Sequence, residues 1–153
     1  MRGHDRRTPW LAAALITLGL GLTGCGSNES SGPASGAEES PAKVEAVAGK
    51  DVKSVTLSEH AEKRLGVETV AAAAVQQGRS VPYSAVFYTP DGSAWVYTVT
   101  TPRTYVREKV VVANVGGADG TEAFLSEGPA VGTTVVTIGA VELYGAEIGV
   151  SEE

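Results

Sequence analysis

Alternating apolar and polar residues dominate the chain from about residue 51 onward, and this period of two predicts β-strands. Glycine- and proline-containing turns separate the apolar segments at a spacing of roughly 10 residues, which is typical of small all-β domains. The expected strands are, in chain order, 52–57, 67–75, 80–87, 95–99, 105–112, 121–126 and 134–138, with a final turn and strand over 141–150. The pattern therefore predicts a mainly β fold, a small antiparallel barrel or sandwich.

Some of these segments carry further signals. The alanine run 71–74 could extend a helix, but the valines that flank it favour a strand. Pro82 marks its segment as an edge strand or a strand start, because proline has no N–H for the ladder. The turn signal at 89–92 predicts a hairpin over 80–100. Apolar throughout, 134–138 is expected to be buried on both faces.

One short helix is expected over 59–65. Ser58 can cap its first turn, which carries acidic residues that suit the positive end of the helix dipole. Basic Lys63 and Arg64 stand in the last turn, and Gly66 follows at the position where a left-handed residue ends many helices. The segment therefore predicts two helical turns within an otherwise β domain.

The N-terminus resembles a bacterial lipoprotein leader. Three arginines within the first seven residues precede the uncharged apolar run 10–22, which is shorter than the roughly 20 residues that a membrane-spanning helix needs. The run ends in Leu22-Thr23-Gly24-Cys25, which resembles the lipobox. This resemblance implies cleavage between Gly24 and Cys25 and a lipid on the Cys25 sulfur. A buried structural cysteine after an ordinary signal is the alternative, and Arg6-Arg7 leaves twin-arginine export open beside the general route.

The chain is thus expected to have three parts: a signal peptide over 1–24, the lipidated cysteine with a flexible linker over 25–50, and a β domain over 51–153. Small, polar and acidic residues fill the linker, and such a composition buries too little apolar surface to order the chain. Two or more acyl chains give stable anchoring. We therefore expect the domain to be held on the extracytoplasmic face of the bacterial cell membrane without spanning it.

Composition excludes several classes of function. The 153 residues contain 12 Lys and Arg against 18 Asp and Glu, and removing 1–24 takes away three Arg and one Asp, which moves the formal charge from −6 to −8. This acidity argues against nucleic acid, whose phosphates need basic residues. The single cysteine rules out an internal disulfide and a cysteine-built zinc site. We expect neither a metal nor another cofactor.

Catalytic motifs are missing from the sequence, so we expect no enzyme. His60 stands at an exposed helix start without a partner nucleophile, and no Gly-x-Ser-x-Gly motif is present. Glu142 and Glu147 could hold a cation, but their spacing is unspecific. Aromatic residues on two neighbouring strands have two interpretations, either a docking face or cross-strand pairs in a small core. These residues are Trp95, Tyr97 and Tyr105.

Several motifs, taken in order, resemble one family: the periplasmic adaptor subunits, or membrane fusion proteins, of bacterial efflux transporters. The segment 51–74 resembles the opening of these adaptors, and 81–97, 107–112 and 128–143 resemble their C-terminal, membrane-proximal domain. The quoted motifs are Val55-Thr56-Leu57-Ser58, Leu65-Gly66-Val67-Glu68-Thr69, Val81-Pro82-Tyr83-Ser84-Ala85-Val86, Asp91-Gly92-Ser93-Ala94-Trp95-Val96-Tyr97 and Gly132-Thr133-Thr134-Val135-Val136. The resemblance covers nearly all of the expected β domain.

The chain also departs from the adaptor pattern. Gln76-Gln77-Gly78-Arg79 leads straight between two segments that full adaptors separate by further domains, and no heptad run offers a coiled-coil hairpin. Pro129 and Thr133 replace the family's usual Leu and Asp. The resemblance implies a membrane-proximal domain alone, which docks on an inner-membrane transporter permease and neither transports nor catalyses. The alternative is a free-standing envelope lipoprotein that uses the β domain as a ligand pocket.

Overall fold

Antiparallel strands form most of the domain in the computed structural model, which describes residues 40–76 and 78–149. Within these residues there are ten strands, two short α-helices and one 3₁₀ turn. The strands are β1 (Ala42–Ala46), β2 (Lys53–Leu57), β3 (Glu68–Ala71), β4 (Ala73–Val75), β5 (Gly78–Pro82), β6 (Phe87–Tyr88), β7 (Ala94–Thr101), β8 (Thr104–Gly116), β9 (Glu122–Glu127) and β10 (Thr134–Ile138). The helices are α1 (Glu59–Leu65) and α2 (Ala140–Ile148), and the 3₁₀ turn is η1 (Tyr83–Ala85).

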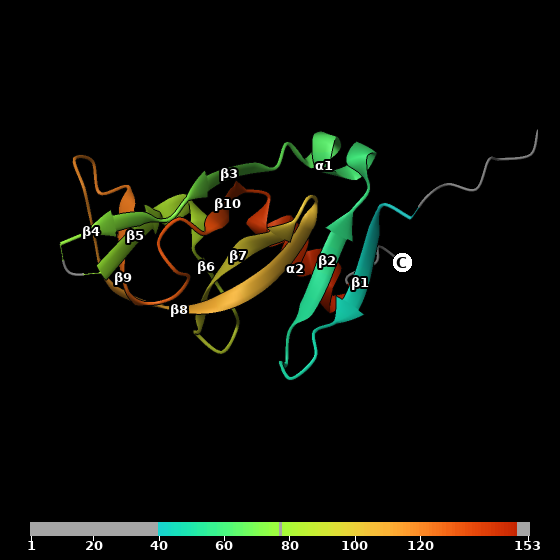
Figure 1. Ribbon diagram of the computed structural model, residues 1–153, viewed down its shortest axis with the longest axis horizontal. Coiled ribbons are helices and arrows are strands. Elements are labelled where there is room, and N and C mark those ends of the chain that lie inside the picture. Colours follow the sequence, from blue (N-terminus) through green and yellow to red (C-terminus); the bar gives the residue numbers. More distant parts are fainter. Residues whose placement is uncertain (1–39, 77, 150–153) are drawn as a thin grey trace, which may run out of the picture. The chain divides into compact units, whose positions relative to one another are not determined.

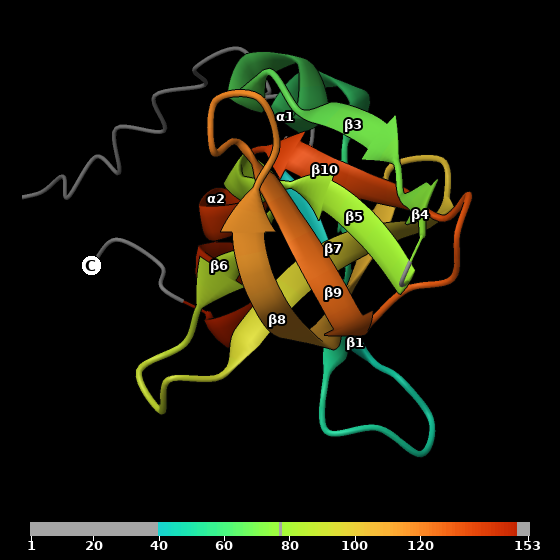
Figure 2. The ribbon, with the colours of Figure 1, turned by 90° about the vertical axis from the view of Figure 1, so that its left-hand side faces the viewer.

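Seven of the strands form a nearly closed barrel, in the order β3-β10-β7-β8-β9-β5-β4. The two ends of this path, β3 and β4, are one stretch of chain interrupted at Ala72 (Figure 2). Ala72 accepts a hydrogen bond from the Gly132 N–H at 2.8 Å and donates its own N–H to the Thr133 carbonyl at 2.9 Å. The break lets one stretch of chain serve two sheets, and the predicted mainly β fold is confirmed.

The long strand β8 turns the sheet around the barrel. Its first part pairs with β7 and its second part with β9, and the register shifts between Val111 and Val112 and again before Asn114. Such bulges bend a strand and increase its twist. On its other edge the first part of β8 pairs with β2, which pairs with β1, so these two strands extend the sheet at the end away from β4 and β5 (Figure 1).

Successive residues of β7 and β10 point into two different cores. Val96 and Val135 face the barrel interior, whereas Tyr97 and Val136 face α2, and all four are fully buried. We call the first group the barrel core: Ala72, Val81, Ala85, Val96, Val110, Ala123, Leu125 and Val135. We call the second the helix-side core: Val55, Leu57, Ala61, Phe87, Tyr97, Tyr105, Val136, Ala140 and Leu143. The prediction that 134–138 is buried on both faces is confirmed at its centre.

The expected helix over 59–65 is confirmed as α1. The Ser58 hydroxyl accepts the Ala61 N–H at 3.2 Å, and Gly66 ends the helix in the left-handed conformation with φ of 62°. Ala61 is buried in the helix-side core, so this helix closes one end of that core.

The expected final strand over 141–150 is wrong, because Ala140–Ile148 form the helix α2. Gly139 starts it from a left-handed conformation with φ of 96°, which breaks the extended run of β10. Leu143 and Glu147 are four residues apart, lie on one face of the helix and are both buried. The apolar residues Val141, Leu143, Ile148 and Val150 fitted a strand or a helix, and burial of one face against the sheet favours the helix. The domain therefore has two helices, where the sequence predicted one.

Two further segments differ from the prediction. The expected strand over 80–87 is interrupted by η1, which the Val86 N–H closes by donating to the Tyr83 carbonyl at 3.0 Å. Every second residue is apolar there, but the chain turns after Pro82. The linker expected to reach residue 50 ends earlier, since Ala42–Ala46 pair with Lys53–Leu57 as β1 and β2. None of the helices in the described ranges has the length and apolar character needed to cross a membrane.

Candidate functional site

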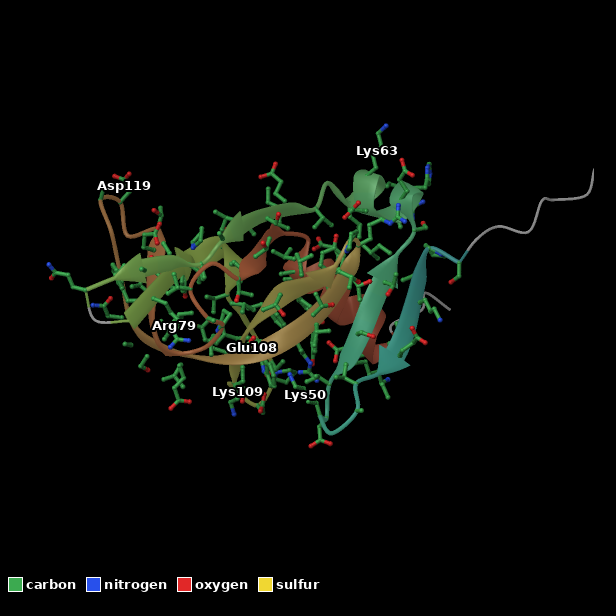
Figure 3. The ribbon with its side chains drawn as sticks, viewed as in Figure 1. Lys50, Lys63, Arg79, Glu108, Lys109 and Asp119 are labelled. Atoms are coloured by element: carbon green, nitrogen blue, oxygen red, sulfur yellow. The ribbon has the colours of Figure 1, made fainter. Side chains whose placement is uncertain are left out.

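A groove of about 680 Å³ opens on the surface between the β7–β8 hairpin, α2 and two loops. Trp95, Arg107 and Tyr144 are partly buried in it. Exposed charged residues from three segments surround them: Lys50, Asp51, Asp91 and Lys109. Figure 3 shows Lys50, Glu108 and Lys109 near one another at one edge of the domain, away from Lys63 on α1. The groove thus combines aromatic surface with charges of both signs.

The register of β7 and β8 explains why these side chains meet. Trp95 lies opposite Lys109, and Tyr97 lies opposite Arg107. Residues that are opposite or two apart share a sheet face, so all four project toward α2. The helix covers the Tyr97 end of this face and leaves the Lys109 end open.

A buried carboxylate organises the covered end. Glu147 of α2 is only 3% exposed, and its side chain accepts three hydrogen bonds. The donors are the Tyr97 hydroxyl at 2.5 Å, the Arg107 Nε at 2.9 Å and the backbone N–H of Lys53 at 3.0 Å. A buried carboxylate needs this many partners to offset its loss of water. Glu147 therefore ties α2 to three strands at once.

The network keeps the Tyr97 phenol protonated. Burial is the main cause that raises the pKa of Tyr97, and its hydrogen bond to Glu147 raises it further. The phenol is thus the hydrogen-bond donor in its contact with the Glu147 side chain. Tyr105 behaves similarly in the same core: burial, followed by its bond to Glu62, raises the pKa of its phenol.

Two aromatic rings lie near the Arg107 guanidinium. The centre of this guanidinium lies 4.5 Å from the centroid of the Trp95 ring and 5.6 Å from that of the Tyr144 ring. Both distances allow a cation–π attraction, and the side chain is only 16% exposed. Since Nε is bound to Glu147, the orientation of the whole guanidinium plane is determined before any ligand arrives.

The turn at 89–93 fixes the position of the Trp95 ring. The indole Nε1 donates to the Thr89 hydroxyl oxygen at 3.1 Å, and that hydroxyl in turn donates to the Asp91 carboxylate. The Asp91 carboxylate also accepts from the Ser93 hydroxyl at 2.8 Å. These bonds, that of Thr89 first, lower the pKa of Asp91 to about 2, so the carboxylate is charged at neutral pH. This series of hydrogen bonds from Asp91 through Thr89 to the indole lies at the groove edge.

The predicted aromatic residues are divided by the structure. Trp95 lines the groove, whereas Tyr97 and Tyr105 are 0% and 1% exposed and belong to the helix-side core, which was the alternative interpretation. His60 is exposed on α1, as expected. Glu142 is exposed while Glu147 is buried and paired with Arg107, so the two carboxylates do not converge on a cation. Gly24 and Cys25 lie outside the described residues.

Arg107 and Tyr144 were missed as site residues, and Glu147 was considered only as a cation ligand. One signal was available: Arg107 follows Tyr105 by two residues, so a charged side chain shares a strand face with an aromatic one. Its partner carboxylate was hidden because 141–150 was expected to be a strand. No three His, Cys, Asp or Glu side chains within 40–76 and 78–149 gather closely enough to hold a metal ion.

We compared the chain with protein-family models, with curated proteins and with solved structures, and none of them matches it.

Proposed function

We propose that this chain is a lipid-anchored extracytoplasmic interaction module that docks, without catalysis, on a transmembrane efflux or transport protein. Three features support the proposal. The Leu22-Thr23-Gly24-Cys25 motif provides an anchor upstream of the domain. The motifs between 51 and 143 resemble, in order, the membrane-proximal part of periplasmic adaptors. The groove around Arg107 provides a preorganised surface on which a partner can bind.

The observation that carries the docking role is the buried Glu147–Arg107 pair. Removing two charges from water costs several kcal/mol for each ion, and well-packed apolar residues often stabilise a protein as well or better. The barrel core of this same domain is built from Ala, Val and Leu. The Glu147–Arg107 pair lies under an open groove, and its stabilising effect alone does not explain it. We infer that Glu147 serves to orient Arg107 at the groove.

Membrane fractionation tests the anchor. Wild-type chain should sediment with membranes, and the Cys25→Ala variant should move to the soluble fraction because it lacks the sulfur that carries the lipid. Ser27→Ala, two residues away, serves as the matched control and should stay with the membranes. A Cys25→Ala variant that remains membrane-bound in high salt would refute the anchor.

Chemical crosslinking in intact cells tests the docking. After pull-down, we expect one integral membrane protein of the transport class to be enriched over a strain that lacks the chain. Recovery of soluble proteins alone would contradict the proposal.

A second function has a specific observation in its favour. The groove volume of about 680 Å³ lies within the range of small-molecule sites, about 300–1,000 Å³, and its aromatic walls are typical of them. A free-standing ligand-binding lipoprotein would gain thermal stability from its ligand, by about 2.7 kcal/mol at 100 times Kd. A small-molecule screen that gives no stabilisation would exclude this function and leave the docking module in place.

A further inference from the structure

The outer edge of the Arg107 guanidinium is free to bind. Nε is bound to Glu147, and neither Nη group makes a hydrogen bond with another residue in the described part of the chain. No fully buried side-chain nitrogen or oxygen in that part lacks a partner. The Nη groups are therefore not fully buried, and Arg107 is one of the residues that line the groove.

Parallel donors on a fixed guanidinium fit one planar oxyanion best. A carboxylate can accept two parallel N–H hydrogen bonds from one edge of a guanidinium. The Trp95 and Tyr144 rings that flank Arg107 provide apolar surface against which the carbon atoms beside such a carboxylate can pack.

The charges around the groove disfavour a ligand with several negative charges. Lining residues include three cations, Lys50, Arg107 and Lys109, and three anions, Asp51, Asp91 and Glu108. Arg107 is already paired with Glu147, which adds a fourth anion nearby. A polyphosphate or an anionic membrane surface would meet as much repulsion as attraction here. A single carboxylate on an otherwise mixed polar segment would not.

We propose that the groove binds the single Asp or Glu carboxylate of an extended, otherwise uncharged polar segment of the membrane partner, with both Nη groups of Arg107 as donors. This step rests on the docking function proposed above. Lys109 and Lys50 steer the segment from the groove edge, and Trp95 and Tyr144 contact its carbon atoms. Glu147 is a positioning residue, which orients Arg107 and does not touch the partner.

Tryptophan fluorescence provides a direct test. The chain contains two tryptophans, and Trp10 lies in the predicted leader, so Trp95 is the only one left after cleavage. The lipidated chain, purified in an uncharged detergent, would be titrated with N-acetyl-glutamic acid amide, which has one carboxylate, and with the glutamine analogue, which has none. We expect saturable quenching by the first only. The proposal would be overturned if both probes quenched the Trp95 emission equally, or if neither probe quenched it.

Two variants distinguish paired hydrogen bonding by the Arg107 guanidinium from a general effect of positive charge. Arg107→Lys keeps the positive charge but loses the two parallel donors, so we expect about 10-fold weaker binding of the glutamate probe. Lys109→Glu reverses an exposed charge at the groove edge and should weaken binding several-fold. Lys63→Glu makes the same change on α1, far from the groove in Figure 3, and should have no effect. Equal effects of Lys109→Glu and Lys63→Glu would contradict the assignment even if Arg107→Lys failed to fold.

Further probes distinguish this inference from its alternatives and from the docking function itself. Inorganic phosphate and phosphatidylglycerol vesicles should change Trp95 emission less than the glutamate probe. A stronger response to phosphate would indicate a phosphate site, and a stronger response to vesicles a lipid site. If the probe fails while crosslinking still recovers a membrane partner, the carboxylate inference falls and the docking function stands. If no partner is recovered, the docking function falls by itself.

Discussion

The two cores of this domain share strands β7, β8 and β10 but differ in chemistry. The barrel core contains only aliphatic side chains from Ala, Val and Leu, whereas the helix-side core contains two buried tyrosines and borders the Glu147–Arg107 pair. Adjacent residues of one strand thus contribute to both, as Val96 and Tyr97 do. The first core needs only volume and shape, while the second also depends on protonation state and hydrogen bonding. The two faces of one sheet therefore have different chemical requirements.

Removing the buried carboxylate should give the largest change in stability. In Glu147→Ala, Arg107 and Tyr97 lose their acceptor, and breaking a buried ion pair typically costs about 3–5 kcal/mol. Glu147→Gln should cost less, because its amide oxygen still accepts. Urea unfolding measures both. An alanine variant that loses less than about 1 kcal/mol would show that the network does not hold α2.

A cavity in the barrel core should cost slightly less and leave the groove unchanged. Leu125 is 1% exposed, so Leu125→Ala should lower the free energy of unfolding by about 3 kcal/mol through lost burial and an unfilled cavity. Ile148→Ala is the control, because that side chain is 51% exposed and should cost about 0.5 kcal/mol or less. Trp95 emission should be the same in both variants. A shift in Leu125→Ala would mean that the two cores are coupled.

Alkaline pH should destabilise the domain through the tyrosines of the helix-side core. The pKa of Tyr97 is raised in the folded protein, so the native phenol keeps its proton above pH 10 while the unfolded one loses it. Stability is then fully present below about pH 10 and falls above it, by at most about 1.4 kcal/mol per pH unit for this group. Tyr105, whose pKa is also raised, adds to the fall. Urea unfolding at pH 8, 10 and 11 measures the slope, which should flatten in Tyr97→Phe.

Loss of the α1 cap should have the smallest effect. Ser58→Ala removes the acceptor for the Ala61 N–H and should cost about 1 kcal/mol. Hydrogen exchange should become faster in α1 and β2, which border the helix-side core, and remain slow at Val96 and Leu125. Uniformly faster exchange would mean that the domain opens only as a whole.

The sequence predicted best where local signals act alone. Ser58 and Gly66 delimit α1, and the alternation of β9 buries Ala123 and Leu125, because capping and period two need no distant partner. It failed where tertiary contacts decide. The apolar residues of 141–150 fit a strand as well as a helix, and the choice depends on contacts with distant residues, such as the bond from Arg107 to Glu147, 40 positions away. The Arg107 groove depends on that pairing, so no local pattern could have assembled it.

Site-specific photocrosslinking in intact cells tests the central claim most directly. A photoreactive residue would replace Lys109 at the groove edge or, as the control, Lys63 on α1 (Figure 3). If the groove is the docking site of a membrane-anchored module, position 109 should form a discrete adduct with an integral membrane protein, and position 63 should not. The 109 adduct should also diminish in Arg107→Lys. An adduct from position 63 alone, or none from either position, would contradict the account.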